Sequence, residues 1–243
     1  MKLEGKIALV TGGGRGIGKA IARTFAREGA KVVICSRSGL ELKETEKEIK
    51  GEGKDVLIHV ADVTSIREVQ RLFKTIKSYF GPVDLLINNA SILGPKSEIL
   101  SYPYQEWIRV IDVNLTGVFN VTQSALRQMI PKKSGCIVNI SSGVGRQGKA
   151  LWGAYAVSKF GVEGLTQVLA EETAPHQIRV YSLNPGPTRT KMRAAACPDE
   201  DPLTLPPPEK IAETCLYLVT TLTLGDSGRT FDAASLFEKA NSA

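Results

Sequence analysis

Short apolar runs alternate with longer amphipathic segments along most of the chain. The apolar runs, rich in Val and Ile, predict strands at 6–10, 31–35, 55–60, 85–88, 136–140 and 178–184. Helical spacing of apolar positions predicts intervening helices, among them 16–28, 40–51, 65–79, 104–129 and 155–174. Strands that alternate with helices are typical of a parallel sheet covered on both faces. The pattern therefore predicts an α/β fold with a doubly wound sheet.

The segment 187–208 interrupts this alternation. It is rich in proline and small residues and is longer than an ordinary strand–helix connection. Connections of this length are usually functional or disordered, and we expect a substrate lid. No internal repeat or linker divides the chain, so residues 1–243 are predicted to form one domain, with a C-terminal tail at 234–243.

Composition narrows the class of protein. Of the 243 residues, 42% are hydrophobic and 23% charged, as in ordinary globular proteins, and no apolar run is long enough to cross a bilayer. The N-terminus lacks the pattern of a signal peptide, so we expect a cytoplasmic protein. The net charge of +6 comes without basic blocks interleaved with aromatic residues, so no nucleic-acid partner is expected. The four cysteines lack metal-ligand spacing, and no metal site is expected.

Tyr155 and Lys159, one helical turn apart, carry the strongest chemical signal. They share one face of the predicted helix, and Ser142 precedes the tyrosine by thirteen residues. A phenol has a pKa near ~10, so acid–base work at neutral pH needs a nearby positive charge that stabilises the phenolate. The Lys159 ammonium is such a charge. Because such pairs also occur in structural helices, the interpretation depends on the other motifs of the chain.

A glycine-rich turn follows the first predicted strand. Gly12, Gly16 and Gly18 lie where the strand gives way to a helix, so backbone amides can face a pyrophosphate at the helix N-terminus. The spacing differs from the dinucleotide fingerprint G-x-G-x-x-G. Taken alone, the turn is also compatible with tight helix packing.

The end of the second predicted strand bears on the choice of dinucleotide. Sites for NAD place an acidic side chain there, on the adenosine ribose. This chain has Ser36 followed by Arg37, and Arg15 lies inside the glycine turn. A carboxylate would repel a 2′-phosphate, whereas a hydroxyl and a guanidinium would bind it. These residues favour NADP(H) over NAD(H); the alternative is that both arginines are merely exposed loop residues.

In order and spacing, these motifs resemble the short-chain dehydrogenase/reductase family. The resemblance covers residues 3–233 and rests on the turn at 11–18, Asn88-Asn89-Ala90, Asn114, Ser142, Tyr155 with Lys159, and Asn184-Pro185-Gly186. The stretch 145–153 is similar to one bacterial branch of that family. The resemblance implies a single-domain Rossmann fold and an NAD(P)-dependent oxidoreductase.

The resemblance also implies roles for individual residues. Tyr155 would donate or accept the proton, Ser142 would polarise the substrate oxygen, and Lys159 would lower the tyrosine pKa and bind the nicotinamide ribose. Asn114 would hold a water that relays protons to Lys159. The implied cofactor-binding residues are Gly12, Arg15, Gly16, Ile17, Gly18, Ser36, Arg37, Asp62, Val63, Asn88, Ala90, Tyr155, Lys159, Pro185, Gly186, Thr188 and Thr190.

Within that set, Asp62 and Val63 would hold the adenine, Asn88 and Ala90 would line the cofactor path, and the two threonines would meet the carboxamide. Two serines leave questions open. Ser141 remains the structural alternative to Ser142, because neighbouring strand residues point to opposite faces. Ser91 stands where the family usually has glycine, which adds a side chain near the nicotinamide pocket.

These observations predict an NADP(H)-dependent enzyme that interconverts a carbonyl compound and an alcohol by hydride transfer. A non-catalytic NADP(H)-binding regulator is the alternative. The predicted substrate wall is apolar and consists of Leu93, Val144, Trp152 and Met192. A 3-oxoacyl thioester is one candidate substrate, and a basic cluster that could dock an acidic carrier protein consists of Arg127, Lys132 and Lys133.

The helix that carries the tyrosine has a second apolar or small-residue stripe, formed by Val157, Gly161, Leu165 and Val168. A helix that is apolar on two faces needs two surfaces to pack on. We therefore expect a homodimer or homotetramer whose interface includes Leu165 and Val168. The alternative is a helix buried wholly within one subunit.

Overall fold

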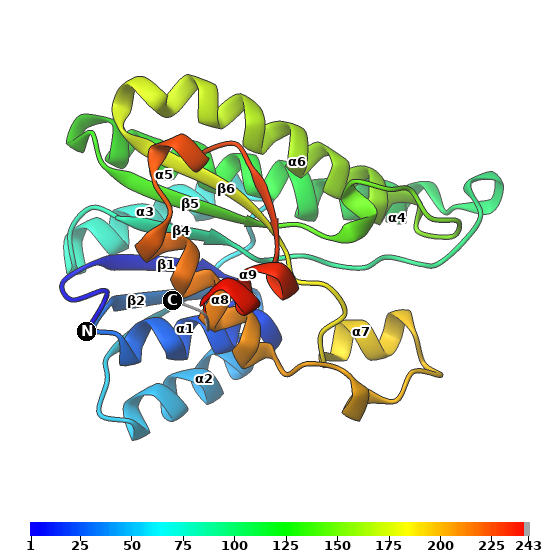
Figure 1. The fold of residues 1–243 in the computed structure, drawn as a ribbon, viewed down its shortest axis with the longest axis horizontal. Helices are drawn as coiled ribbons and strands as arrows, with labels where there is room; N and C mark the ends of the chain where they lie inside the picture. Colours follow the sequence, from blue (N-terminus) through cyan, green and yellow to red (C-terminus); the bar gives the residue numbers. More distant parts are fainter. Residues whose placement is uncertain (241–243) are drawn as a thin grey trace.

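The computed structural model describes residues 1–240 and places a seven-stranded parallel sheet between two layers of helices (Figure 1). The strands are β1 (Ile7–Thr11), β2 (Lys31–Ser36), β3 (Val56–Val60), β4 (Leu85–Asn88), β5 (Gly135–Ile140), β6 (Ile178–Asn184) and β7 (Thr230–Asp232). Their order is β3-β2-β1-β4-β5-β6-β7, and every neighbouring pair is parallel. The predicted doubly wound α/β fold is confirmed.

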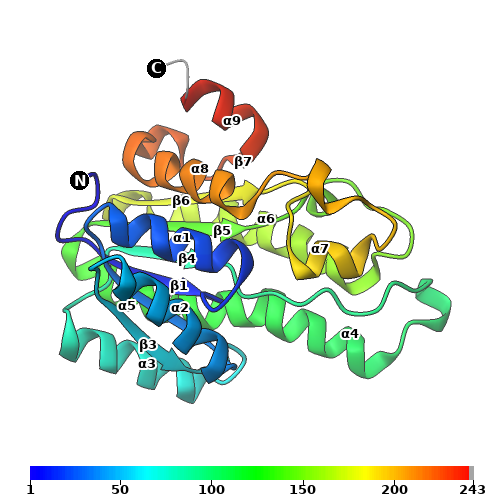
Figure 2. The same cartoon turned by 90° about the horizontal axis from the view of Figure 1, so that it is seen from below.

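The main helices cover both faces of the sheet (Figures 1 and 2). One layer consists of α1 (Gly16–Arg27), α2 (Gly39–Gly51), α8 (Pro208–Thr221) and α9 (Ala233–Ala240), and the other of α3 (Ile66–Tyr79), α5 (Gly117–Lys132) and α6 (Gly153–Thr173). Two shorter helices, α4 (Tyr104–Ile111) and α7 (Lys191–Ala196), lie beyond the end of the sheet. None of the described helices is both long and apolar enough to cross a membrane.

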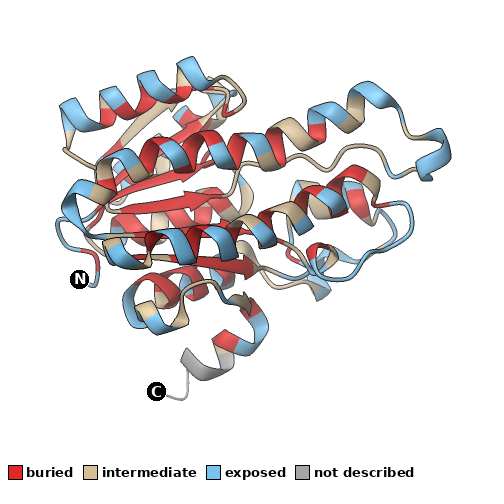
Figure 3. Ribbon diagram, turned by 90° about the horizontal axis from the view of Figure 1, so that it is seen from above, coloured by how far each residue is buried: buried red, intermediate tan, exposed pale blue. Residues whose placement is uncertain are grey.

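The sheet is buried on both faces because successive side chains of a strand point in opposite directions. In β1, Ala8 and Val10 pack against α1 and α8, whereas Ile7 and Leu9 pack against the layer of α3 and α5. Figure 3 shows the buried residues gathered on the strands and on the inward faces of the helices. Continuous apolar strands are therefore what this architecture requires.

The predicted strands agree with the observed ones to within one residue at each end. The seventh strand, β7, was not predicted, because three half-buried residues at the edge of a sheet carry no detectable periodicity. The predicted helix 104–129 is divided into α4, the π-helical turn η2 (Asp112–Thr116) and α5. An inserted π turn preserves the apolar pattern on either side, so the pattern does not reveal the break.

The C-terminal part of the chain is more ordered than a tail. Residues predicted as a tail at 234–243 form helix α9 as far as Ala240, and Leu236 is buried in the core beside α8. Residues 241–243 of that predicted tail lie outside the described residues. The predicted lid at 187–208 contains α7 and the short 3-10 turn η5 (Pro202–Thr204).

A row of polar side chains crosses the sheet beneath α5 and α6. Its members are register partners in four successive strands, namely Asn88, Asn139, Ser182 and Thr230. Asn88 donates from Nδ2 to Asn139 Oδ1 at 2.8 Å, and Asn139 donates from Nδ2 to Thr166 Oγ1 of α6 at 2.9 Å. The row therefore ties the helical layer to the sheet by hydrogen bonds in a dry interior.

Replacement of Asn139 by Ala should destabilise the fold by about 2–4 kcal/mol, because it takes one hydrogen-bond partner from each of the buried side chains of Asn88 and Thr166. Urea unfolding followed by circular dichroism measures this loss. Ser78→Ala, on the exposed side of α3, is the matched control and should change the free energy of unfolding by less than about 0.5 kcal/mol. Equal effects of the two substitutions would contradict the prediction.

Candidate active site

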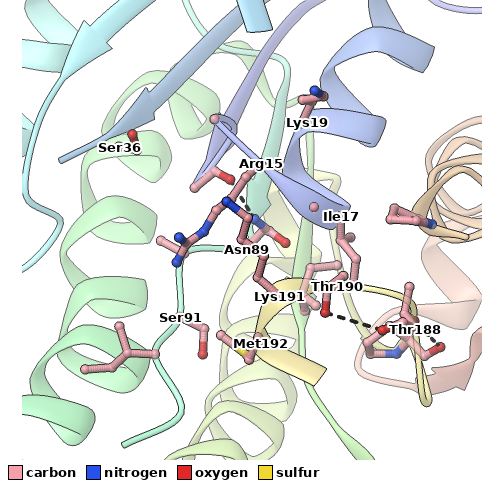
Figure 4. A pocket seen from close by; sticks show the side chains of 18 of the residues that line it. Arg15, Ile17, Lys19, Ser36, Asn89, Ser91, Thr188, Thr190, Lys191 and Met192 are labelled. Carbon is pink, nitrogen blue, oxygen red and sulfur yellow. Dashed lines mark hydrogen bonds between the residues drawn. The ribbon is translucent and has the colours of Figure 1, made fainter. Parts of the chain in front are cut away.

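A cavity of about 770 Å³ opens at the carboxyl edge of the sheet, where the strand order reverses between β1 and β4. Doubly wound sheets bind their ligands at such a reversal. Figure 4 shows that side chains from four regions meet there: Arg15, Ile17 and Lys19 near the start of α1, Ser36 at the end of β2, Asn89 and Ser91 after β4, and Thr188, Thr190, Lys191 and Met192 after β6.

Most of the predicted site residues line this cavity. They are Gly12, Arg15, Gly16, Ile17, Ser36, Arg37, Asp62, Val63, Ala90, Ser142, Tyr155, Lys159, Pro185, Gly186, Thr188 and Thr190. Three predicted residues, Gly18, Asn88 and Asn114, are not part of its wall. Segments far apart in the sequence are thus brought to one place by the parallel strands that precede them.

The glycine turn needs glycine for two different reasons. Gly12 and Gly16 have φ angles of +65° and +53°, a conformation that other residues rarely adopt. Gly18 is required by contact, since a Cβ there would lie 2.3 Å from the Gly12 carbonyl oxygen and 2.4 Å from Asn89 Nδ2. Gly18 therefore lets α1 pack directly on the turn, and it acts from beneath the cavity.

The N-terminus of α1 has no cap from the protein. Arg15, at the capping position, makes no side-chain capping bond, and the first turn contains no acidic residue. The amides of a first helical turn have no acceptor inside the helix, and the helix dipole adds a partial positive charge. Because Gly16 and Ile17 line the cavity, this end of the helix suits a phosphate group.

Two residues absent from the predicted site hold the turn against β4. Thr11 accepts hydrogen bonds from the amides of Asn89 and Ala90, each at 3.0 Å, through its Oγ1. Asn89 donates from Nδ2 to the carbonyl oxygens of Thr11 at 2.9 Å and Gly12 at 3.2 Å. Their signal in the sequence was that both belong to the motifs at 11–18 and 88–90, at the ends of two predicted strands.

Asn88 does not line the cofactor path as expected. Its side chain is buried and donates to Thr122 Oγ1 at 2.9 Å and to Asn139 Oδ1. The residue occupies the last position of β4, where the pleat turns it beneath α5. It supports the sheet, and Asn89, the next residue, faces the cavity in its place.

Asn114 lies in the π-helical turn η2 and is fully buried. Its Nδ2 donates to the Ile92 carbonyl at 2.9 Å and to Ser158 Oγ at 3.1 Å, and its Oδ1 accepts from the Ile92 amide at 2.8 Å. Both amide protons are used within the protein. The side chain thus ties the segment after β4 to α6, and its predicted part in a proton relay stays a prediction.

The predicted catalytic side chains come together on the inner wall of the cavity. Tyr155 and Lys159 are buried on α6, with Lys159 Nζ 5.6 Å from the centre of the tyrosine ring and donating to the Ile140 carbonyl at 2.8 Å. Of the two adjacent serines, Ser142 is the one whose side chain forms a hydrogen bond with the Tyr155 hydroxyl. Ser141 keeps its Oγ buried, without a hydrogen-bond partner among the described residues.

Burial controls the ionisation of both groups. It raises the pKa of Tyr155 to about 12, against a smaller opposing influence of the Ser142 hydroxyl. It lowers the pKa of Lys159 to about 8, with the charge of Glu163 acting in the opposite direction. The net shift of the Tyr155 pKa is upward, opposite to the expected lowering, because desolvation of the phenolate dominates. At neutral pH the protein therefore presents a protonated phenol beside an ammonium group.

The far end of the cavity carries two cations in exposed ion pairs. The Arg37 guanidinium lies 3.8 Å from the Asp62 carboxylate, and that of Arg15 lies 3.1 Å from Glu41. Both arginines are largely exposed, and surface pairs of this kind contribute little stability. Their guanidinium groups therefore remain available to an anion, and Ser36 brings no negative charge beside them.

An apolar cluster forms the opposite side of the cavity. It contains the four predicted wall residues, Leu93, Val144, Trp152 and Met192, of which Val144 does not line the cavity. In the predicted lid, α7 supplies lining residues and is held by a 2.9 Å bond from Lys96 Nζ to the Ala196 carbonyl. Arg193 pairs with Glu200 inside the lid, so its charge is largely neutralised.

The basic cluster proposed as a carrier dock lies elsewhere. Lys132 forms an ion pair with Asp84, the residue before β4, and Lys133 ends α5 in a left-handed conformation. This is the amino edge of the sheet, whereas the cavity opens at the carboxyl edge. The placement of the cluster gives no support to carrier docking there.

Comparison with known proteins agrees with this geometry. Residues 6–201 match the model of the short chain dehydrogenase family. The uncharacterized oxidoreductase YciK of Escherichia coli K12 is 38% identical over 234 residues, covering 95% of this chain and 92% of that protein. The 3-oxoacyl-[acyl-carrier-protein] reductase FabG of Thermotoga maritima is 37% identical over 236 residues, covering 97% and 90%.

A solved structure shows the same similarity in three dimensions. A short-chain dehydrogenase of Escherichia coli CFT073 in complex with NADPH superposes with a TM-score of 0.91 at 38% identity, covering 95% of this chain and 97% of that one. The family match includes the glycine turn, six of the seven strands and the tyrosine–lysine pair. The chain therefore belongs to the short-chain dehydrogenase family and is an oxidoreductase.

Proposed function

We propose that the protein is an NADP(H)-dependent reductase that interconverts a carbonyl compound and an alcohol. The observation that carries the proposal is that an uncapped helix N-terminus and a buried, protonated Tyr155 beside Ser142 share one cavity. The NADPH complex of one similar protein and the reductase activity named for another support it. A regulator that only binds the dinucleotide would have no use for the acid–base group.

The shape and charge of the cavity fit a dinucleotide with a 2′-phosphate. The start of α1 would hold the pyrophosphate, and Ser36 with Arg37 would hold the 2′-phosphate. The positive φ of Gly12 and Gly16 keeps side chains out of the space that the phosphates would need. The adenine would lie against Asp62 and Val63, and the carboxamide would meet Thr188 and Thr190. When bound, NADPH supplies the hydride.

Side chains of the protein itself carry out the proton transfer. Tyr155, kept protonated by its raised pKa, donates its proton to the substrate oxygen. Ser142 donates a hydrogen bond to the same oxygen and fixes its position. Lys159, with a pKa of about 8, is positive at neutral pH and stabilises the phenolate that remains after the transfer. A tyrosine that is protonated at neutral pH is in the form that reduction requires, and reduction is the expected direction in a cytosol that keeps NADPH reduced.

The apolar wall favours a moderately hydrophobic ketone or aldehyde as substrate. Leu93, Trp152 and Met192 present apolar surface, and the guanidinium of Arg193 is engaged by Glu200. A 3-oxoacyl thioester remains a candidate, since one similar protein is a 3-oxoacyl-[acyl-carrier-protein] reductase. A panel of such carbonyl compounds, screened by loss of NADPH absorbance, identifies the substrate class.

We further propose that α5 and α6 pair two or more copies of this chain. The α6 residues Val157, Phe160 and Val168 are 46%, 45% and 54% exposed, and Phe119 of α5 is 49% exposed. A Cβ at Gly164 would meet nothing within 4 Å, so another helix can approach closely there. Leu165, by contrast, packs partly against its own core. Covering such an apolar strip favours a homodimer or homotetramer.

Replacement of Tyr155 by Phe should reduce turnover of the best panel substrate by roughly 100-fold or more, because the transferable proton is lost. NADPH affinity, measured by fluorescence titration, should stay nearly unchanged. The matched control is Tyr102→Phe, which removes a buried hydroxyl without a partner among the described residues and should leave turnover intact. Retention of about a tenth of wild-type turnover in Tyr155→Phe would show that another residue handles the proton.

The double substitution Ser36→Asp and Arg37→Gln should weaken NADPH binding by roughly 10-fold or more relative to NADH, because a repelling carboxylate replaces a charge-assisted contact. The ratio of the two dissociation constants measures the effect. Arg109→Gln, which removes an exposed arginine of α4, is the control and should leave the ratio unchanged. A wild-type protein that already prefers NADH would contradict the assignment.

Light scattering should give a mass of at least twice the 26.2 kDa of one chain, and Val168→Glu should lower it by placing a charge on the exposed strip of α6. Leu40→Glu, at an exposed position of α2 in the helical layer on the other face of the sheet, should leave the mass unchanged. An active wild-type protein with the mass of a single chain at micromolar concentration would refute the proposed assembly.

A further inference from the structure

Helix α6 carries a third ionisable residue in line with the tyrosine and the lysine. Glu163 follows Lys159 by four residues, as Lys159 follows Tyr155, so the three side chains lie along one face of the helix. Glu163 is only 6% exposed and Lys159 only 3%. A glutamate is rarely buried to this extent unless it is paired. The mechanism proposed above makes no use of it.

Glu163 is fixed by the sheet. Thr230 Oγ1, in β7, donates a hydrogen bond to Glu163 Oε2, while Oε1 is buried and has no hydrogen-bond partner among the described residues. Thr230 belongs to the polar row that crosses the sheet, and Asn139 of the same row bonds Thr166, three residues further along α6. The carboxylate is thereby held at a constant position relative to the helix.

Glu163 acts on Lys159 through its charge. Glu163 is the charged side chain that raises the pKa of Lys159 against the effect of burial. Charged or ionisable groups also occur on the elements packed against α6, namely Arg146 after η3 (Gly143–Gly145), Glu106 and Arg109 of α4, Asp112 of η2, His176 of η4 (Ala174–His176), Arg179 and Tyr181 of β6, and Asp232 of β7.

Among these groups, Arg146 feels the charge of Glu163, and its guanidinium is already paired with a carboxylate. That carboxylate belongs to Asp232, and the ion pair is bidentate. Arg179 donates to main-chain carbonyls of α8 and the residue after it, on the other face of the sheet. The charge of Glu163 therefore acts on Lys159 across an interior in which charges are weakly screened.

We propose that Glu163 is a positioning residue for the reaction: its buried carboxylate, anchored by Thr230, keeps Lys159 in the ammonium form that stabilises the Tyr155 phenolate. The inference rests on the proposed function, in which Lys159 has this role. Without the carboxylate, the ammonium loses its counter-charge and releases its proton at a lower pH. Activity that needs the ammonium then declines at a lower pH.

The pH dependence of kcat tests the proposal. Glu163→Gln should shift the alkaline limb of the profile downward by roughly one pH unit. Glu163→Met, which fills the same space without a charge, should give the same shift, and it replaces the Gln variant if that variant folds poorly. Glu163→Asp keeps the charge and should restore the wild-type limb. Ser182→Ala, the matched control, alters the neighbouring position of the polar row without changing a charge, and should not move the limb.

A second readout needs neither substrate nor cofactor. Acetylation of Lys159 by acetic anhydride, measured by mass spectrometry across a pH series, reports the proton occupancy of its amine. The midpoint should fall by roughly one pH unit in Glu163→Gln and in Glu163→Met. Limbs and midpoints that stay within about 0.2 pH unit of wild type, with only thermal stability reduced, would overturn the proposal. A wild-type protein inactive on every carbonyl would instead refute the proposed function, and the labelling would still decide the role of Glu163.

Discussion

The contact between the glycine turn and the end of β4 sets the geometry on which the site depends. Because Gly18 has no side chain, the Asn89 amide reaches the carbonyls of Thr11 and Gly12, and α1 starts directly above the turn. A single methyl group at Gly18 would lie 2.3 Å from a carbonyl oxygen. This contact aims the N-terminus of α1 at the cavity and sends the chain after β4 toward Ile92, where Asn114 joins it to α6.

Burial then tunes the chemistry of α6. Removing a phenol and an ammonium from water shifts their pKa values toward the neutral forms, upward for Tyr155 and downward for Lys159. The tyrosine therefore remains a proton donor, while the lysine needs a counter-charge to stay protonated. Glu163, one turn further along the helix and anchored to β7, supplies that charge in our proposal. In the proposed function, dinucleotide binding and proton transfer would thus depend on different features, namely free helix amides and buried charges.

The proposed substrate side of the cavity differs from the proposed dinucleotide side in its charge and polarity. Charges near it are paired within the protein, as in Arg193 with Glu200, which leaves apolar surface to face a ligand. The lid is tied to the segment after β4 by Lys96, whose ammonium also lies 5.6 Å from the centre of the Trp152 ring. In the proposed function, selectivity on this side would rest on shape and apolar contact, which tolerate related substrates more readily than paired hydrogen bonds do.

The sequence by itself determined the α/β class, six of the seven strands and most of the predicted residues that meet at the cavity, because periodicity and motif spacing are local properties. It could not show that Asn88 turns into the sheet, or that both amide protons of Asn114 are used by Ile92 and Ser158. The tertiary structure alone decided that burial raises the pKa of Tyr155 and that Thr230 reaches Glu163. Desolvation and long-range hydrogen bonds depend on which distant segments pack together, and only the folded chain specifies that packing.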